Sequence, residues 1–388
     1  MGGWHRDDGV RMRLLRSFGE PRPGETPCSD DVLSAVAFDA KGANLAVGDE
    51  GGRVVLFASD GGSGFDYASE FQAQEAKVDH LRSTPIPAAV TALGWSPWGV
   101  VASSEREVAL WSVRGKKPRR VRELSRAHTY RVHSVSASAD GETLLSADDL
   151  RLNLWRADRA GPAFTALDLR PDDMVDLEEV MTVATFHPRD GHGLLYATST
   201  GRTATVDLRA GALAETGVEL GSAIRQRSSS ASSFGDPYDA VTEGATDARY
   251  AGVFGVLVRD FFTLTLWDLR RPIRPVARWD LHEDLRPHVH ALHKSQAIYE
   301  RFGCACDGAG RIAVTGLFGN AFSVADALKP HEPPRRAVIR GGAPLSSEDG
   351  LCTGEPVLAM AHHPSKDLIA VATTYALSIF EGVAAPPP

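Results

Sequence analysis

The chain has 388 residues, a formal net charge of −8 and 43% hydrophobic residues. A chain of this length can bury a substantial core without a disulfide or metal staple. The four cysteines have neither the spacing of a disulfide framework nor that of a zinc site. The acidic balance argues against general nucleic-acid binding, because contacts with phosphates need a basic face.

Two further absences bear on the compartment. No stretch approaches the roughly 20 apolar residues of a membrane-spanning helix, and the N-terminus has no apolar core of signal-peptide length. We therefore expect a cytoplasmic protein without membrane association, with the nucleus as a second compartment.

Seven segments share one plan, in which an apolar strand, a turn, a second strand, a polar turn and a third strand follow one another. Their third strands end in an aromatic or aliphatic residue about every 50 residues, a repeat typical of WD-type β-propellers. The segments span residues 33–57, 91–113, 132–155, 182–208, 239–269, 298–325 and 357–380.

The repeat predicts an all-β fold, namely a seven-bladed propeller formed by a single domain over residues 1–388. The last blade has no sequence for a fourth strand after Phe380, so we expect residues 10–18 to complete it, because an unclosed ring would expose a sheet edge. The composition of three insertions predicts mobile loops at residues 59–66, 221–237 and 329–355.

Catalytic motifs are not evident. The sequence has no Gly-x-Ser-x-Gly elbow, Walker loop, His-Glu-x-x-His or Cys-x-x-Cys. The histidines at 282–293 do not have the spacing of metal ligands, and a structural or solvated role is favoured for them. We therefore expect no enzyme activity, no cofactor and no metal site.

Two acidic features suggest binding instead. Asp148 and Asp149 occupy a turn between two strands, and five of the nine residues of DDMVDLEEV (172–180) are acidic. Met174, Leu177 and Val180 have helical spacing, which predicts a short helical turn with its acids in solvent. The ordinary interpretation is a solvated face; the sharper one is a platform for a basic, partly helical peptide, with Leu177 between two acidic patches.

Several motifs resemble the WD-repeat B family of regulatory subunits of protein serine/threonine phosphatase 2A. The specific ones are AHTY (127–130), SADDLR (146–151), VDLEEV (175–180) and RFGCACDGAG (301–310), and the resemblance covers most of the chain in the family's order. It implies a heterotrimer with a helical-repeat scaffold subunit and a catalytic subunit. It also implies recruitment of phosphoprotein substrates with basic segments through Tyr130, Asp148, Asp149, Leu177 and Glu179, with Glu178 adding an acid nearby.

One departure leaves an alternative open. Family members carry a long hairpin arm for the scaffold after the second blade's Trp, whereas only residues 112–126 separate Trp111 from AHTY here. The basic run at 115–122 is either a solvated edge strand or a contact for an acidic partner. The chain is thus expected to be a phosphatase regulatory subunit or, alternatively, a WD-repeat adaptor that has lost scaffold docking. A propeller hydrolase is the third and least favoured hypothesis.

Overall fold

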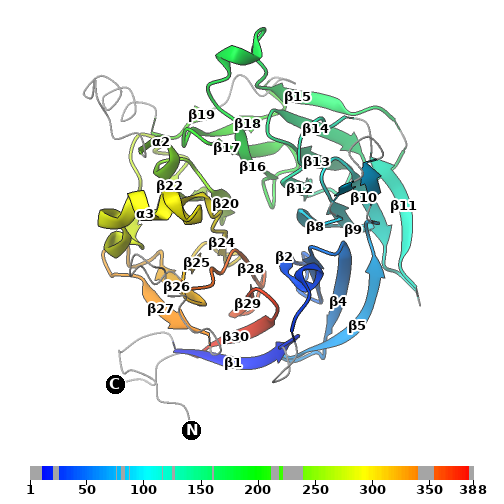
Figure 1. The fold of residues 1–388 in the computed structure, drawn as a ribbon, viewed down its shortest axis with the longest axis horizontal. Coiled ribbons are helices and arrows are strands. Elements are labelled where there is room, and N and C mark those ends of the chain that lie inside the picture. Colours follow the sequence, from blue (N-terminus) through cyan, green and yellow to red (C-terminus); the bar gives the residue numbers. More distant parts are fainter. Residues whose placement is uncertain are drawn as a thin grey trace.

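The computed structural model describes residues 11–20, 26–75, 77–79, 84–86, 88–115, 117–124, 127–159, 161–210, 218–221, 239–339 and 354–383. Over these residues the chain forms seven four-stranded antiparallel sheets, the blades, arranged around a central axis (Figure 1). This confirms the predicted seven-bladed propeller. No helix of the described residues is long and apolar enough to cross a membrane.

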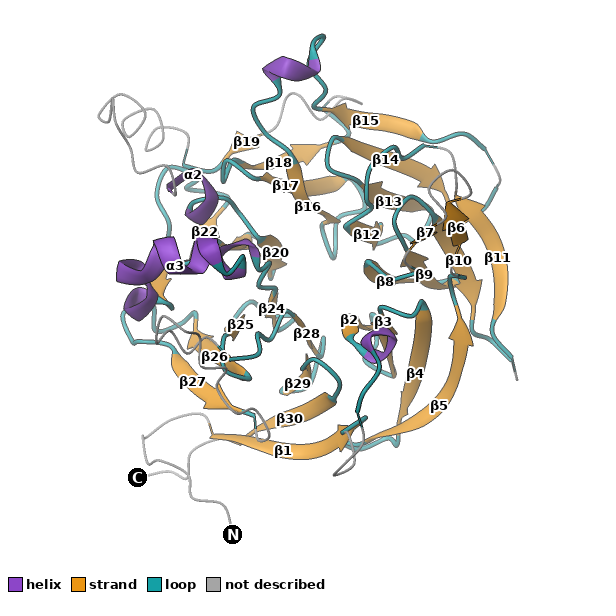
Figure 2. Cartoon of the chain, viewed as in Figure 1, coloured by secondary structure: helices purple, strands orange, loops and turns teal. Residues whose placement is uncertain are grey.

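The blades follow the chain order, and the first strand of each lies nearest the axis (Figure 2). Blades 1 and 2 consist of β2 (Leu33–Phe38), β3 (Asn44–Asp49), β4 (Arg53–Ser59) and β5 (Phe65–Gln72), then β8 (Ala92–Ser96), β9 (Gly99–Ser103), β10 (Val108–Ser112) and β11 (Arg119–Leu124). Blades 3 and 4 consist of β12 (Ser134–Ala137), β13 (Thr143–Ala147), β14 (Arg151–Arg156) and β15 (Phe164–Asp168), then β16 (Met181–Phe186), β17 (Gly193–Thr198), β18 (Thr203–Asp207) and β19 (Val218–Glu219).

Blades 5 and 6 consist of β20 (Asp247–Ala251), β21 (Gly255–Arg259), β22 (Thr263–Asp268) and β23 (Ala277–Asp280), then β24 (Cys304–Cys306), β25 (Ile312–Leu317), β26 (Ala321–Asp326) and β27 (Arg335–Val338). Blade 7 consists of β28 (Ala359–His362), β29 (Leu368–Ala372), β30 (Leu377–Val383) and β1 (Arg11–Phe18).

The antiparallel order gives the disc two distinct faces. In blades 1 to 6 the chain enters and leaves on one face, which in every blade also carries the turn between the second and third strands; we call this the upper face. The other two turns of blades 1 to 6, the β28–β29 turn, the start of β1 and the end of β30 lie on the lower face. The crossings between blades carry the short helices and one extra hairpin: η1 (Ser29–Asp31), β6 (Lys77–Asp79), β7 (Thr84–Ile86), η2 (Met174–Asp176), α2 (Asp239–Thr242), η4 (Glu283–His288), α3 (Val289–Lys294) and η5 (Ala297–Tyr299).

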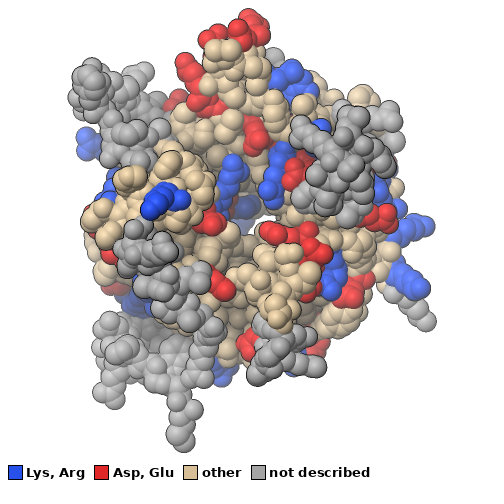
Figure 3. Space-filling model, viewed as in Figure 1, with Lys and Arg blue, Asp and Glu red and all other residues tan. Residues whose placement is uncertain are grey.

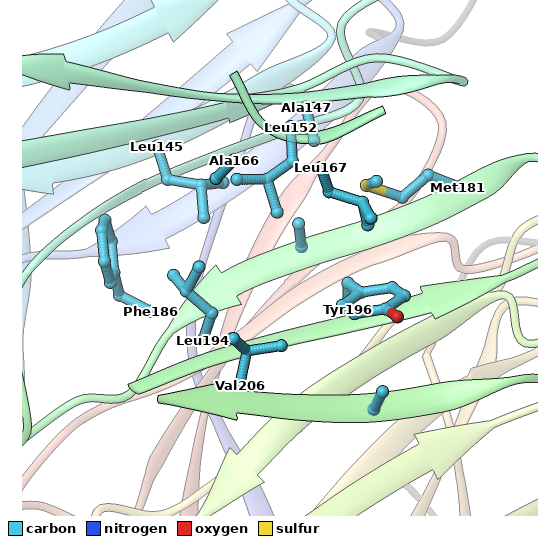
Figure 4. Close-up of a cluster of buried hydrophobic side chains, with 12 residues drawn as sticks. Leu145, Ala147, Leu152, Ala166, Leu167, Met181, Phe186, Leu194, Tyr196 and Val206 are labelled. Atoms are coloured by element: carbon cyan, nitrogen blue, oxygen red, sulfur yellow. The ribbon is translucent and has the colours of Figure 1, made fainter. Parts of the chain in front are cut away.

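The core lies between neighbouring blades. Between blades 3 and 4, Leu145 and Leu152 face Phe186, Leu194 and Val206, and each of these side chains is at most 3% exposed (Figure 4). Middle strands are covered on both faces by the adjacent blades, which explains continuous apolar runs such as LIAVA in β29, whose residues are all buried. Each Leu, Ile or Val side chain of such a run contributes about 1.5–3 kcal/mol by its removal from water.

The N-terminal strand closes the ring. β1 runs antiparallel to β30, with a bulge between Leu14 and Arg16. Met12 is buried in the cluster between blades 6 and 7, and the ring of Phe18 lies 4.7 Å from that of Phe57 in blade 1. The last blade is therefore held by both ends of the chain.

The predicted loops differ from the structure in part. The turn in 59–66 is short, because β4 continues to Ser59 and β5 begins at Phe65. Within the predicted loop 329–355, residues 335–338 form the strand β27. Residues 340–353 of this loop and residues 222–237 of the second loop lie outside the described residues. The hairpin β6–β7 was not predicted. The single-domain assignment stays a prediction.

Closure predicts a stability effect. Removing residues 1–18 should lower the melting temperature by about 5–10 °C, since it bares the backbone of β30 and removes the packing of Met12 and Phe18. The control is Arg13→Ala, which removes only an exposed ion pair with Glu381 and should change the melting temperature by about 1 °C or less. An unchanged melting temperature of the truncated chain would refute closure by β1.

Candidate functional site

Three segments of the upper face carry the predicted platform residues. They are the crossing from β11 to β12, the turn 148–150 between β13 and β14, and the crossing from β15 to β16. The turn is hydrogen-bonded to both ends of the second crossing: Leu169 N donates to Leu150 O at 2.8 Å and Met181 N to Asp149 O at 2.7 Å. The predicted residues therefore share one face at the junction of blades 3 and 4.

Asp148 is the anchor of this junction rather than part of its surface. Its side chain is 0% exposed and accepts four hydrogen bonds. The backbone N–H groups of Leu150 and Arg151 donate to Oδ1 at 2.9 and 2.7 Å. Oδ2 accepts from His128 Nδ1 at 3.0 Å and from Thr129 N at 3.2 Å. The prediction that Asp148 contacts a substrate is wrong, because no part of it is accessible.

A buried polar chain continues from Asp148 into the blade. In the tautomer in which Nδ1 of His128 donates to the carboxylate, its Nε2 accepts a hydrogen bond from the Ser146 hydroxyl at 2.6 Å. Ser146 Oγ in turn accepts from Trp155 Nε1 at 2.8 Å. Burial would raise the pKa of Asp148, but the hydrogen bonds from His128 and the backbone outweigh it and hold this pKa at about 2.

Asp149 points to the axis of the disc. It is partly buried and lines a central cavity of about 560 Å³ together with Arg131 and Arg301. Burial raises the pKa of Asp149, while the charges of Arg301 and Arg131 act in the opposite direction. Of the two adjacent carboxylates, Asp149 is thus the one that a partner can reach.

The acidic turn, residues 172–178, projects from the rim of blades 3 and 4 (Figures 2 and 3). Asp173 caps η2 by accepting from Val175 N at 3.0 Å, so the predicted helical turn is present as one turn of 3-10 helix. Four acidic side chains are exposed and form no salt bridge with the described residues: Asp172, Asp173, Asp176 and Glu178.

Apolar surface accompanies these charges. Val175 is 88% and Met174 46% exposed, whereas Leu177, the predicted apolar anchor, is partly buried. Tyr130, in the neighbouring crossing, is 37% exposed. Val175 was not among the predicted site residues; it lies two residues after the capping Asp173 and donates its backbone N–H to that side chain.

Glu179 is tied to blade 4. Its Oε2 accepts from Thr198 Oγ1 at 2.7 Å and Thr200 Oγ1 at 2.9 Å, and its Oε1 accepts from Arg202 Nη1 at 3.0 Å. Burial would raise the pKa of Glu179, but these three hydrogen bonds lower it. Glu179 thus holds the crossing on blade 4 while its side chain stays partly exposed, and substrate contact at Glu179 stays a prediction.

Known proteins give this geometry a context. Residues 118–156 match the model of the WD domain, G-beta repeat. The β-propeller domain of Myceliophteria thermophila Cps50 (Swd1) superposes with a TM-score of 0.63 at 15% identity and covers 96% of this chain and 99% of that one, which supports the fold.

Sequence relatives are closer. The gamma isoform of the 55 kDa regulatory B subunits of serine/threonine-protein phosphatase 2A from Macaca fascicularis is 29% identical over 433 residues, covering 94% of this chain and 95% of the relative. The gamma isoforms from Rattus norvegicus and Mus musculus are also 29% identical, over 90% of this chain and 93% of theirs. The chain is a relative of the 55 kDa regulatory B subunits of phosphatase 2A. The resemblance drawn from the motifs is confirmed.

Likeness to the B subunits also bears on catalysis. These relatives are named as regulatory subunits, which supports the expectation that this chain is not an enzyme. Among the predicted site residues, the structure separates buried from accessible side chains. Asp148 is fully buried and holds the loops in place; Asp149, Leu177 and Glu179 are partly buried, and Tyr130 and Glu178 are exposed.

Substitution of the two adjacent aspartates should change the free energy of unfolding by very different amounts. Asp148→Asn should cost about 2–4 kcal/mol of unfolding free energy, because the new amide NH₂ must face two of the four donors that the carboxylate accepts. Asp149→Asn, the matched control, should change it by no more than about 0.5 kcal/mol. Denaturant unfolding of both variants measures the difference; equal effects would contradict the assignment.

The depressed pKa of Asp148 also predicts the direction of a pH effect. A carboxyl group with a folded-state pKa of about 2 and an ordinary value of 3.8 stabilises the fold fully above pH 3.8. This contribution is lost as the pH falls toward 2. In Asp148→Asn the corresponding acid-dependent loss should be absent from the unfolding curves.

Proposed function

We propose that this chain is a non-catalytic regulatory subunit of a type 2A protein serine/threonine phosphatase, and that its upper face recruits phosphoprotein clients through their basic segments. The names of its relatives support the regulatory role. The observation that carries the recruitment is the hydrogen bond from Met181 N to Asp149 O, because it holds the acidic turn and the Asp149 turn side by side on one face.

The charges of the acidic turn act mainly on the rate at which a client associates with the chain. Asp172, Asp173, Asp176 and Glu178 lie within seven residues and have no cationic partner among the described residues. Such exposed carboxylates attract Lys and Arg side chains over about 8 Å at physiological salt and raise association rates and selectivity more than affinity. We therefore expect binding of basic segments to weaken as the ionic strength rises.

Affinity needs an apolar contact as well. Val175 and Met174 are the exposed apolar side chains of the acidic turn, and burying a side chain of this size under a partner contributes about 1.5–3 kcal/mol. The charges would thus speed the association of a client segment that carries both basic and apolar residues. Its apolar contact with Val175 would slow its dissociation. Tyr130 offers a second aromatic contact on the neighbouring crossing.

In this proposal the chemistry belongs to other chains. A scaffold subunit would hold this propeller beside a catalytic subunit, and a client bound at the acidic turn would be presented to the catalytic subunit's active site. Concentrating the client near that site is a gain in effective concentration rather than a change in the reaction itself.

A second candidate rests on the lower face of blade 2. β10 ends at Ser112 and β11 begins at Arg119, so the turn is far shorter than the scaffold-gripping arm that the family resemblance implies. Arg114, Lys117, Arg119 and Arg120 are exposed around it. The alternative function is a WD-repeat adaptor that binds basic peptides on the upper face and associates with no phosphatase scaffold.

Client capture tests the proposed site. Asp176→Lys and Glu178→Lys should each weaken binding of a fluorescent peptide with Lys, Arg, Val and Leu residues by about 5–10-fold, since each replaces attraction by repulsion. Fluorescence anisotropy at two salt concentrations measures this. The control is Glu142→Lys, an exposed acid in the same blade that lies on the lower face. Unchanged binding by both test variants would refute the platform.

The same preparations separate the two candidate functions. Association of the wild-type chain with a purified phosphatase 2A scaffold subunit at micromolar concentration supports the regulatory subunit. Peptide capture without scaffold association supports the adaptor instead.

A further inference from the structure

The central cavity is lined by more than the residues that the proposed function uses. It lies on the axis of the disc, between the innermost strands, and measures about 560 Å³. In Figure 3, Lys and Arg side chains lie along one side of the opening at the centre, and Asp and Glu side chains lie along another. Three arginines from different blades contribute to the lining: Arg131 from the crossing into blade 3, Arg249 from β20 and Arg301 from the crossing into blade 6.

These arginines differ in how well they are paired. Arg249 contacts Asp247 at 3.2 Å, and Arg131 lies 3.7 Å from Glu105 in a partly exposed pair. Arg301 is exposed, and no ion pair or hydrogen bond of its side chain occurs within the part of the chain that the structure describes. Arg301 therefore has guanidinium N–H donors available at the cavity.

His133 also lines the cavity. Its Nδ1 lies 2.9 Å from Ser134 Oγ, which accepts from Ala184 N at 3.1 Å. Its Nε2 is buried and has no hydrogen-bond partner among the described residues. Burial and the charge of Arg301 lower the pKa of His133 to about 4, so the ring is neutral at pH 7.

Acids lie in the same lining. Asp149, Glu50 and Asp247 face the cavity, so the site is of mixed charge and does not suit a free anion alone. The positive charges of Arg301 and Arg131 act to lower the pKa of Asp149. A client that brings only a cation to Asp149 would compete with Arg301 and place two positive charges together. A client that also brings an anion would give Arg301 a partner of its own.

We propose that the cavity mouth is a second subsite, which binds an acidic group of the client through Arg301 while a neighbouring basic residue of the same segment pairs with Asp149. This inference rests on the proposed function and defines its client class: a segment in which a Lys or Arg lies next to a carboxylate or a phosphate ester. Guanidinium groups bind both anions through paired N–H donors, and the cavity is large enough for several side chains.

Three peptides test the subsite. The parent is the basic, apolar peptide used for client capture; the second carries Glu and the third phosphoserine beside one basic residue. We expect the wild-type chain to bind the Glu peptide about 3–5-fold and the phosphoserine peptide about 10-fold more tightly than the parent. A gain with phosphoserine only would assign the subsite to phosphate esters, and a gain with both would assign it to acidic groups in general.

Arg301→Gln distinguishes the subsite from simple neutralisation of Asp149. The gain from Glu and phosphoserine should disappear in this variant, while the parent peptide binds as well as to the wild type or better. The control is Arg106→Gln, an exposed arginine of the upper face that is not part of the cavity lining, and it should keep the gain. Melting temperatures verify that both variants fold.

Two results would overturn the inference while leaving the proposed function intact. In the first, the parent peptide binds but acidic groups give no gain. In the second, Arg301→Gln alters the binding of all three peptides by the same factor, which would make Arg301 a counter-ion of Asp149 and nothing more. If the parent peptide does not bind to the wild-type chain at all, the proposed function fails, and the inference fails with it.

Discussion

The hydrogen bond between His128 and Asp148 is the interaction on which the upper face depends. It belongs to a fully buried chain of polar groups that runs from Trp155 through Ser146 to His128 and ends on a carboxylate with four donors. Because every member has its partners, the chain is stabilising rather than costly. It joins a crossing, a turn and the body of blade 3 into one unit.

A rigid foundation of this kind gives the exposed residues their value. The crossing that carries the acidic turn is linked to blade 3 through Asp149 O and to blade 4 through the three hydrogen bonds of Glu179. The end of this crossing is therefore fixed relative to the Asp149 turn at the cavity. A preorganised surface loses less entropy when a peptide binds, so a small number of charged and apolar contacts suffices for recognition.

The sequence indicated the architecture because each repeat consists of apolar runs of strand length, the third of which ends in an aromatic or aliphatic residue. The N-terminal strand was predictable because the sequence of the last blade supplies only three strands, so that its edge would stay open without a fourth. The candidate site was predictable only as a region. Adjacent aspartates indicate a turn, but only the fold decides that the side chain of Asp148 is buried beneath the turn and that Asp149 lines the central cavity. Glu179 looked like its neighbour Glu178 until Thr198 and Arg202 were placed beside it.

The central cavity was beyond prediction for a different reason. Its arginines come from blades 3, 5 and 6 and lie far apart in sequence, so no local pattern brings them together; ring closure does. The same limit applies to Val175, whose exposure follows from the one-turn helix of the acidic turn and not from its hydrophobicity.

Hydrogen–deuterium exchange of the chain, alone and saturated with a basic, apolar peptide, tests the central claim most directly. The account predicts slower exchange in residues 127–131, 148–150 and 172–180, with no change in the lower-face turns at 138–142 and 252–254. Slower exchange on the lower face without any change at the acidic turn would contradict it.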